Sequence, residues 1–196
     1  MQFANAELIA ERTYTLSKLL RGQRGSEPGM GAPAGARVVV LDGGMTQNGL
    51  SRSELGLPLN WQAGRAGAGV GSEDYTSYQK TFTGRGERPL SPVHVRGRAQ
   101  ADGSIAISWI RRTRTGGDSW EVAEVPLGET VESYSVEIRQ GGVLKRSLSA
   151  SGAFASYTAA MQAEDFGGPA ASFDVWVYQL SETFGRGVPA VAHYEA

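Results

Sequence analysis

The sequence predicts an all-β protein, and three observations lead to that prediction. Seven strand-like segments follow one another between Val93 and Tyr194, each bounded by turn residues. The chain holds 27 glycines and 8 prolines in 196 residues, a composition that suits short strands joined by many turns. The connections within residues 1–84 are dense in glycine, and each interior glycine would cost a helix about 1 kcal/mol relative to alanine.

The segments after residue 92 predict a seven-strand immunoglobulin-like sandwich, because so many short strands in about 105 residues are its sequence signature. They span residues 93–99, 104–112, 131–140, 142–150, 154–161, 173–181 and 188–194. Side chains alternate across a strand, so one face of the second, third and sixth segments is apolar. The predicted core comprises Ile105, Ile107, Trp109, Tyr134, Val136, Ile138, Val175 and Val177. On the opposite face of the sixth segment, Trp176 and Tyr178 are either covered by a neighbour or available to one.

Three regions are predicted along the chain: a small β domain at residues 1–84, a linker at 85–91 and the sandwich at 92–196. The linker concentrates glycine, proline and charge without apolar periodicity. In the first region, extended segments are predicted at residues 6–10, 14–20, 37–41, 59–63 and 75–82. Residues 5–20 also fit a helix in part, but the run TYT at residues 13–15 favours a hairpin.

Composition argues against several classes of function. The net charge of -1 lacks the basic excess that binding to a phosphate backbone requires, so we expect no nucleic-acid partner. No apolar run approaches the roughly 18 residues of a membrane-spanning helix, so we expect no membrane insertion. There is no cysteine, and His94 and His193 have no third metal-ligand type close in sequence. A GxSxG motif is also absent, and we expect no metal, no cofactor and no enzymatic activity.

The run RRTRTGGDSWE at residues 111–121 is the strongest candidate for a contact surface. It follows a core strand as a loop, and loops on rigid scaffolds often carry binding residues. Arginine and tryptophan are enriched at interface hot spots, so the candidate partner contacts are Arg111, Arg112, Arg114 and Trp120. Two alternatives stay open: Trp120 covers the sandwich edge while the arginines pair with glutamates, or the loop contacts a receptor or polysaccharide. The glutamates concerned are Glu121, Glu124, Glu129 and Glu132.

Trp61, Tyr75 and Tyr78 form a weaker candidate in the first region. Their rings have the shape to stack on sugars, but aromatic residues on the strands of a small β domain usually belong to its core. We therefore favour the core interpretation for all three.

Several residues after Pro89 match a known pattern. They are Pro92 at the start, Trp109 in the second segment, Tyr134 in the third and VWVYQLSETFGRG at residues 175–187. With them, the region from Pro89 to the C-terminus resembles a fibronectin type III domain. The resemblance implies that Trp109 and Tyr134 pack together in the core and that a glycine turn follows the sixth strand. Phe173 stands where that family usually has its corner tyrosine, so the hydroxyl bond of that tyrosine is missing or supplied elsewhere.

A second resemblance covers nearly the whole chain. It rests on residues 6–27 (AELIAERTYTLSKLLRGQRGSE), 36–43 (ARVVVLDG), 88–97 (RPLSPVHVRG), 107–129 (ISWIRRTRTGGDSWEVAEVPLGE) and 179–190 (QLSETFGRGVPA). Together they resemble the C-terminal part of the large tail-tip protein of long-tailed bacteriophages and gene transfer agents, often called the host-specificity or baseplate megatron protein. The run SWIRRTRTGGDSW at residues 108–120 is its most specific piece. The proteins of that family are far longer, with upstream hub and barrel-like modules, so we expect the gene either to be split or to encode a separate terminal piece.

This resemblance implies a structural component of a tail tip or baseplate that assembles with other hub proteins. It would present a surface toward the host envelope for attachment, with a host polysaccharide or receptor as a further partner. It also implies a homotrimer within the particle, and a virion location after assembly in the bacterial cytoplasm. One alternative stays open: a carbohydrate-binding or spacer module accessory to a cell-wall or polysaccharide hydrolase.

Overall fold

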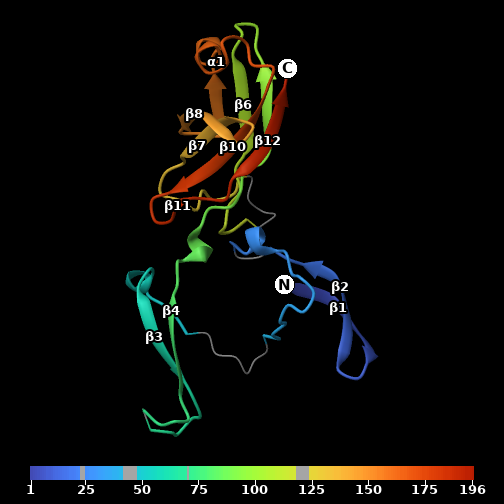
Figure 1. The fold of residues 1–196 in the computed structure, drawn as a ribbon, viewed down its shortest axis with the longest axis vertical. Coiled ribbons are helices and arrows are strands. Elements are labelled where there is room, and N and C mark those ends of the chain that lie inside the picture. The colour runs from blue at the N-terminus through green and yellow to red at the C-terminus, as the bar shows by residue number, and fades with distance from the viewer. Residues whose placement is uncertain (23–24, 42–47, 70, 118–123) are drawn as a thin grey trace. The chain divides into compact units, whose positions relative to one another are not determined.

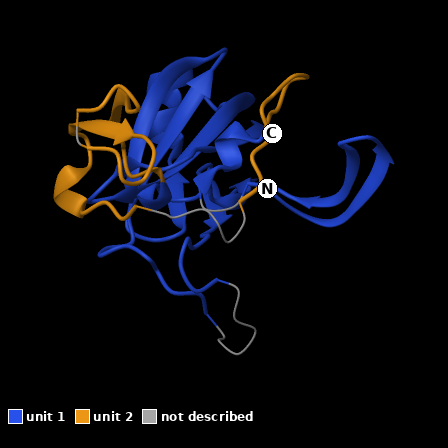
Figure 2. Ribbon diagram, turned by 90° about the horizontal axis from the view of Figure 1, so that it is seen from below, with its two compact units in different colours: residues 1–30, 86–196 blue, residues 31–85 orange. Residues whose placement is uncertain are grey.

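The computed structural model describes residues 1–22, 25–41, 48–69, 71–117 and 124–196. Contacts between residues divide the chain into two compact units, one of residues 1–30 with 86–196 and one of residues 31–85 (Figure 2). This division differs from the predicted one, because residues 1–30 group with the sandwich and not with residues 31–84.

Two antiparallel sheets form the sandwich, and their strand order is that of a fibronectin type III-like fold (Figure 1). The three-stranded sheet has the order β5 (Val93–Ala99), β6 (Ile105–Ile110) and β9 (Phe154–Tyr157). The five-stranded sheet has the order β11 (Gly185–Arg186), β10 (Ser172–Ser181), β7 (Tyr134–Gln140) and β8 (Val143–Ala150), and β12 (Ala190–Glu195) also pairs with β10. The prediction of an all-β sandwich is confirmed.

The core lies between the two sheets. All eight residues assigned to it from the sequence are buried, from Ile105 and Ile107 on β6 to Val175 and Val177 on β10. Trp109 packs edge-on against Tyr134 with ring centroids 5.0 Å apart, as the fibronectin resemblance implies. Along β10 the residues are alternately buried and half-buried, which is the two-residue period expected of a strand covered on one side.

The fifth predicted strand, residues 154–161, is wrong in its second half. β9 ends at Tyr157, and helix α1 (Ala159–Phe166) begins after Thr158. The hydroxyl of Thr158 accepts a hydrogen bond from the N–H of Met161 at 3.2 Å, and this N-cap starts the helix. The hydroxyl of Tyr157 donates a hydrogen bond to Asp165 of the helix at 2.8 Å. Phe173, at the position of the corner tyrosine, has no hydroxyl, and Tyr157 provides a tyrosine hydroxyl bond elsewhere in the sandwich.

The segment predicted as a linker is held against the sandwich from Arg88 onward. Pro89 is buried, and its carbonyl accepts the N–H of Val188 at 3.1 Å. Gly187 meets this segment so closely that an added Cβ would lie 2.8 Å from the Cβ and the carbonyl oxygen of Pro89. A glycine at 187 is therefore required for the contact between the two segments.

Two separate hairpins make up the described strands of residues 1–85. One joins β1 (Gln2–Ala10) to β2 (Thr13–Leu20), and the other joins β3 (Pro58–Ala63) to β4 (Thr76–Thr81). The hairpin interpretation of residues 5–20 is confirmed and the helical one is wrong. None of the described residues among 1–88 is buried, so they contain no core of the kind expected of a small β domain.

The strand predicted at residues 37–41 is wrong, since these residues adopt no regular structure. A run of valines favours a strand, but a strand also needs a neighbour to pair with, and none of the described strands pairs there. Short 3-10 helices complete the described elements: η2 (Glu27–Gly29), η3 (Arg52–Glu54) and η4 (Arg85–Glu87). Among the described residues, no helix has the length and apolar character required to cross a membrane.

Candidate functional site

The arginine segment begins directly after β6 and lies in irregular structure. Arg111, Arg112 and Arg114 line one hollow of about 860 Å³ together with Arg88. The fourth candidate contact, Trp120, lies outside the described residues. The structure therefore brings the three arginines of the prediction together and leaves the position of the tryptophan untested.

Arg111 is bound almost entirely to its own chain. Its guanidinium donates to the carbonyl oxygens of Pro126 at 2.8 Å and Val125 at 3.0 Å, and its side chain is 11% exposed. Its Nε lies 3.8 Å from the carboxylate of Glu132. The same carboxylate accepts a hydrogen bond from the hydroxyl of Tyr134 at 2.7 Å. The pKa of Tyr134 is raised, mainly by burial of the side chain and secondly by this hydrogen bond. Arg111 thus connects the loop to the sandwich core.

The other two arginines also have carboxylate partners. Arg112 donates to both carboxylate oxygens of Glu27, at 3.0 and 3.1 Å. Arg114 donates to Glu129 at 3.1 Å and to the carbonyl oxygen of Gly128 at 3.0 Å. These contacts match the alternative in which the arginines pair with glutamates within the chain. Arg112, with 34% of its side chain exposed, is the most accessible of the three to a partner.

Glu27 is the member of this cluster that the sequence did not indicate. It lies 85 residues before Arg112, and nothing in its local sequence marks it as a partner. Glu129, by contrast, is close enough in sequence for its pairing to be expected. The partly exposed pair of Arg112 with Glu27 contributes about 0–1 kcal/mol. The pair of Arg114 with Glu129 is more enclosed, with 21% and 6% of the two side chains exposed.

A second polar cluster lies on the outer face of the five-stranded sheet, around Glu137. This carboxylate is 3% exposed and accepts hydrogen bonds from Arg139 at 2.9 and 2.7 Å and from Arg186 at 2.6 Å. Burial alone would raise its pKa, but the bonds from the two arginines outweigh burial and lower the pKa of Glu137. The same arginines cover Trp176 and Tyr178, at 4.9 and 4.7 Å from the ring centroids.

The outer face of β10 is therefore covered from within the chain. Trp176 and Tyr178 are half-buried beneath side chains of the same sheet. The sequence placed both rings on this face but did not identify Glu137 as the anion that holds the arginines over them. The available signal was a single glutamate within the apolar strand β7, at a position facing away from the core.

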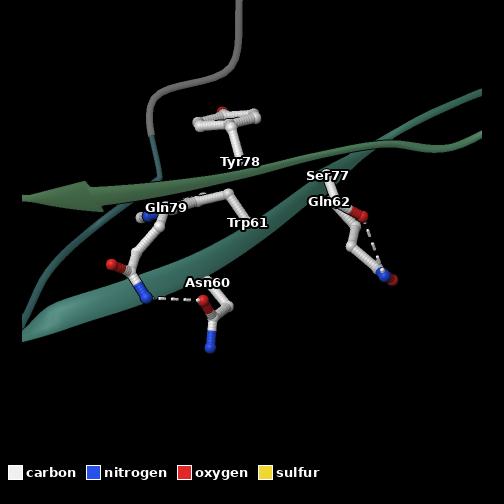
Figure 3. Close-up of a pocket in the computed structure, with 6 residues that line it drawn as sticks. All are labelled: Asn60, Trp61, Gln62, Ser77, Tyr78 and Gln79. Atoms are coloured by element: carbon white, nitrogen blue, oxygen red, sulfur yellow. Dashed lines mark hydrogen bonds between the residues drawn. The ribbon is translucent and has the colours of Figure 1, made fainter.

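A third candidate surface lies on the hairpin of β3 and β4 (Figure 3). Six side chains line a hollow of about 630 Å³: Asn60, Trp61, Gln62, Ser77, Tyr78 and Gln79. Gln79 donates to the side-chain oxygen of Asn60 at 3.1 Å, and Gln62 donates to the hydroxyl of Ser77 at 3.3 Å. Tyr75 does not line this hollow, and its hydroxyl donates to the carbonyl oxygen of Ala68 in the connecting loop.

The histidines lie apart from these clusters. Nδ1 of His193 lies 2.8 Å from Asp174 on the neighbouring strand β10, and His94 is exposed on β5. Within the described ranges, no group of three histidine, aspartate or glutamate side chains is arranged to hold a metal ion.

Comparison with known proteins relates the first residues to one family. The model of the family described as "Rcc01698-like, C-terminal" matches residues 1–39. This segment contains the β1–β2 hairpin and stops well before the sandwich. No curated protein matches the chain.

Solved structures resemble the chain at low sequence identity. The rat CD45 extracellular region, domains d3–d4, matches with 11% identity and a TM-score of 0.40, covering 98% of this chain and 94% of that one. The fibronectin type III domain of human fibronectin type III domain containing protein 3 matches with 12% identity and a TM-score of 0.38, covering 56% and 86%. The Clostridium perfringens spore cortex lytic enzyme SleM matches with 10% identity and a TM-score of 0.35, covering 70% and 38%. Likenesses this weak say nothing about activity, and the strand order itself identifies the fold.

Proposed function

We propose that this chain is a structural component of a phage-like tail tip or baseplate. It assembles with other hub proteins and presents a surface toward the host envelope for attachment. The observation that carries the proposal is the β1–β2 hairpin, an unburied apolar sheet face within the segment that matches the Rcc01698-like C-terminal family. The resemblance of the whole chain to the tail-tip protein of phages and gene transfer agents supports the same conclusion.

Over residues 5–8 and 14–17, the register of the hairpin separates an apolar face from a polar one. Leu8 pairs with Tyr14 and Ala6 with Leu16 on one face. The next rung faces the other way and pairs Glu7 with Thr15. Leu8 is 61% exposed and Tyr14 is 57% exposed.

A lone two-stranded hairpin is marginally stable in water, and an exposed apolar face marks an interaction site. Docking of this face onto a hub protein would bury these side chains and stabilise the hairpin. We infer a homotrimer within the particle, a virion location and no enzymatic activity of its own, all from the tail-tip resemblance. Contact through Arg112 and Trp120 remains part of the same proposal.

The test is a pair of double variants on adjacent rungs of the hairpin. Leu8→Ser with Tyr14→Ser removes apolar side chains from the proposed docking face. Glu7→Ser with Thr15→Ser places the same two serines on the polar face as a matched control. Particles are purified and the incorporated protein is measured by quantitative immunoblot. We expect the first variant to be incorporated at least about tenfold less than the control, and equal incorporation of the two would refute the proposal.

A further inference from the structure

The β3–β4 hairpin carries a face of uncharged hydrogen-bonding groups. The register pairs Asn60 with Gln79 and Gln62 with Ser77, and directly opposed residues of an antiparallel pair share one face. Figure 3 shows Asn60 and Gln79 pointing to the same side of the two strands, with Tyr78 on the other. None of the six side chains that line this hollow is ionisable near neutral pH.

These side chains have hydrogen-bonding capacity beyond their contacts with one another. Asn60 uses only its side-chain oxygen toward Gln79, which leaves both N–H groups of its amide. Gln62 uses one N–H toward Ser77, which leaves its side-chain oxygen and a second N–H, and the Ser77 hydroxyl keeps its own proton to donate. Residues two apart on a strand lie about 6.6 Å apart, so donors and acceptors recur along the face at that spacing.

The aromatic side chains of the hairpin are not core residues. Trp61 is opposed to Tyr78 across the strands and packs edge-on against Phe82, with ring centroids 5.8 Å apart. Tyr78 is 51% exposed, and no described residue of the unit 31–85 is buried. The interpretation of these rings as the core of a small domain is therefore wrong. The Tyr78 ring exposes an apolar surface to solvent.

We propose that the β3–β4 hairpin binds a neutral oligosaccharide, whose hydroxyl groups exchange hydrogen bonds with Asn60, Gln62, Ser77 and Gln79 on one face of the hairpin. The chemistry of the lining selects this class. Sugar hydroxyls are both donors and acceptors, as these amide and hydroxyl side chains are. No lysine or arginine lines the hollow, so an anionic glycan or a phosphate lacks a counter-charge there.

This proposal is independent of assembly into a particle, because it concerns a soluble ligand and the purified chain. The probes are maltohexaose, cellohexaose and chitohexaose, with a hyaluronan hexasaccharide as the charged comparison. Each is titrated into the isotope-labelled full chain and followed by nuclear magnetic resonance. We expect saturable shifts of the side-chain amide signals of Asn60, Gln62 and Gln79 with at least one neutral probe, and none with hyaluronan.

Variants then test the residues themselves. Asn60→Ala with Gln62→Ala is expected to weaken binding of that probe at least about tenfold, by loss of two sets of hydrogen bonds to the ligand. The matched control is Asn5→Ala on the other hairpin, where the Asn5 amide donates to the Ser17 hydroxyl at 3.4 Å in a similar cross-strand pair. This control should bind as the unmodified chain does.

Several outcomes would overturn the proposal: no saturable shift with any neutral probe, binding of hyaluronan alone, or equal binding by the double variant and the control. Amide shifts that depend on protein concentration without sugar would assign the face to a second copy of the chain and would overturn it as well. If the double variant unfolds the hairpin, the shifts of the unmodified chain decide alone. The hairpin variants of residues 7, 8, 14 and 15 test assembly separately, so failure of one proposal leaves the other intact.

Discussion

The sandwich and the region of residues 1–85 are both built from antiparallel strands, but only the sandwich encloses a buried core. Within the described ranges, all 14 buried hydrophobic residues lie between Ile105 and Tyr194. None of the described residues among 1–88 is buried. The difference lies in layers: the sandwich has two sheets facing each other, whereas each hairpin of the N-terminal region is a single two-stranded sheet.

The comparison shows that strand formation and core formation make different demands on a sequence. Alternating side chains and a tight turn are enough to define a hairpin such as β1–β2. A core also requires a second apolar layer at about 10 Å, which the sandwich supplies from its own chain. The hairpins have no such layer among the described residues, so their apolar and aromatic side chains remain free to contact a partner.

The largest expected effect is the difference in free energy of unfolding between tryptophan substitutions made in the two regions. Trp109→Ala removes a buried side chain that packs against Tyr134, and it should lower the free energy of unfolding of the sandwich by about 3–5 kcal/mol. Trp61→Ala in the β3–β4 hairpin should change the same quantity by less than about 1 kcal/mol, because Trp61 is outside that core. Urea unfolding followed by far-ultraviolet circular dichroism measures both. Similar losses for the two variants would show that the regions share a core.

The sandwich was predictable because its strands carry a simple two-residue period. Ile105, Ile107 and Trp109 alternate with smaller or polar residues, and this pattern indicates the buried face without knowledge of the partner sheet. Thr158 was misread because threonine both favours strands and caps helices, and its choice depends on the N–H of Met161 that follows. The four apolar residues 38–41 fit a strand by propensity, but pairing partners are not encoded locally.

Part of the candidate contact surface was predictable because some of its ion-pair partners are close together in the sequence. The pairing of Arg114 with Glu129 spans 15 residues and follows from a loop folding back on itself. The pairing of Arg112 with Glu27 spans 85 residues and depends on tertiary structure that one sequence does not reveal. The alternation along β7 places Glu137 on the outer face of the sheet, where an exposed side chain is expected. It is buried because the side chains of Arg139 and Arg186 cover it and bind its carboxylate.

A smaller effect is expected from Glu137→Gln on the outer face of the sandwich. The substitution removes the charge that holds Arg139 and Arg186 and should cost about 2 kcal/mol at pH 7. Because the folded pKa of Glu137 lies below its unfolded value of about 4.3, its contribution is complete above that pH and is lost as pH falls through the folded pKa.

The difference in unfolding free energy between the unmodified chain and Glu137→Gln should therefore be largest near neutral pH and shrink at acid pH. Urea unfolding at a series of pH values measures it. Glu195→Gln, on an exposed residue of strand β12 in the same sheet, serves as the control and should stay within about 0.5 kcal/mol at every pH. A constant difference down to acid pH would mean that packing of the arginines, and not the carboxylate charge, accounts for the loss.

The start of helix α1 should respond more weakly. Thr158→Ala removes the hydroxyl that accepts from Met161 and should destabilise the sandwich by about 1 kcal/mol. Thr158→Ser keeps an accepting hydroxyl and should restore most of that stability. Thermal unfolding of the three proteins compares them directly. Equal midpoints for alanine and serine would show that Thr158 contributes by its methyl group or backbone and not by the cap.

The smallest effect is expected when the whole region of residues 1–85 is removed. A chain of residues 86–196 keeps every buried hydrophobic residue of the described core and the contact of Pro89 with Val188, and it loses the partly exposed pair of Arg112 with Glu27. Such a pair contributes about 0–1 kcal/mol, so the free energy of unfolding measured in urea should fall by less than about 1 kcal/mol. A loss of several kcal/mol would place part of the sandwich's stability in the N-terminal region. The hairpins would then support the sandwich, and their exposed faces would no longer be explained by partners outside the chain.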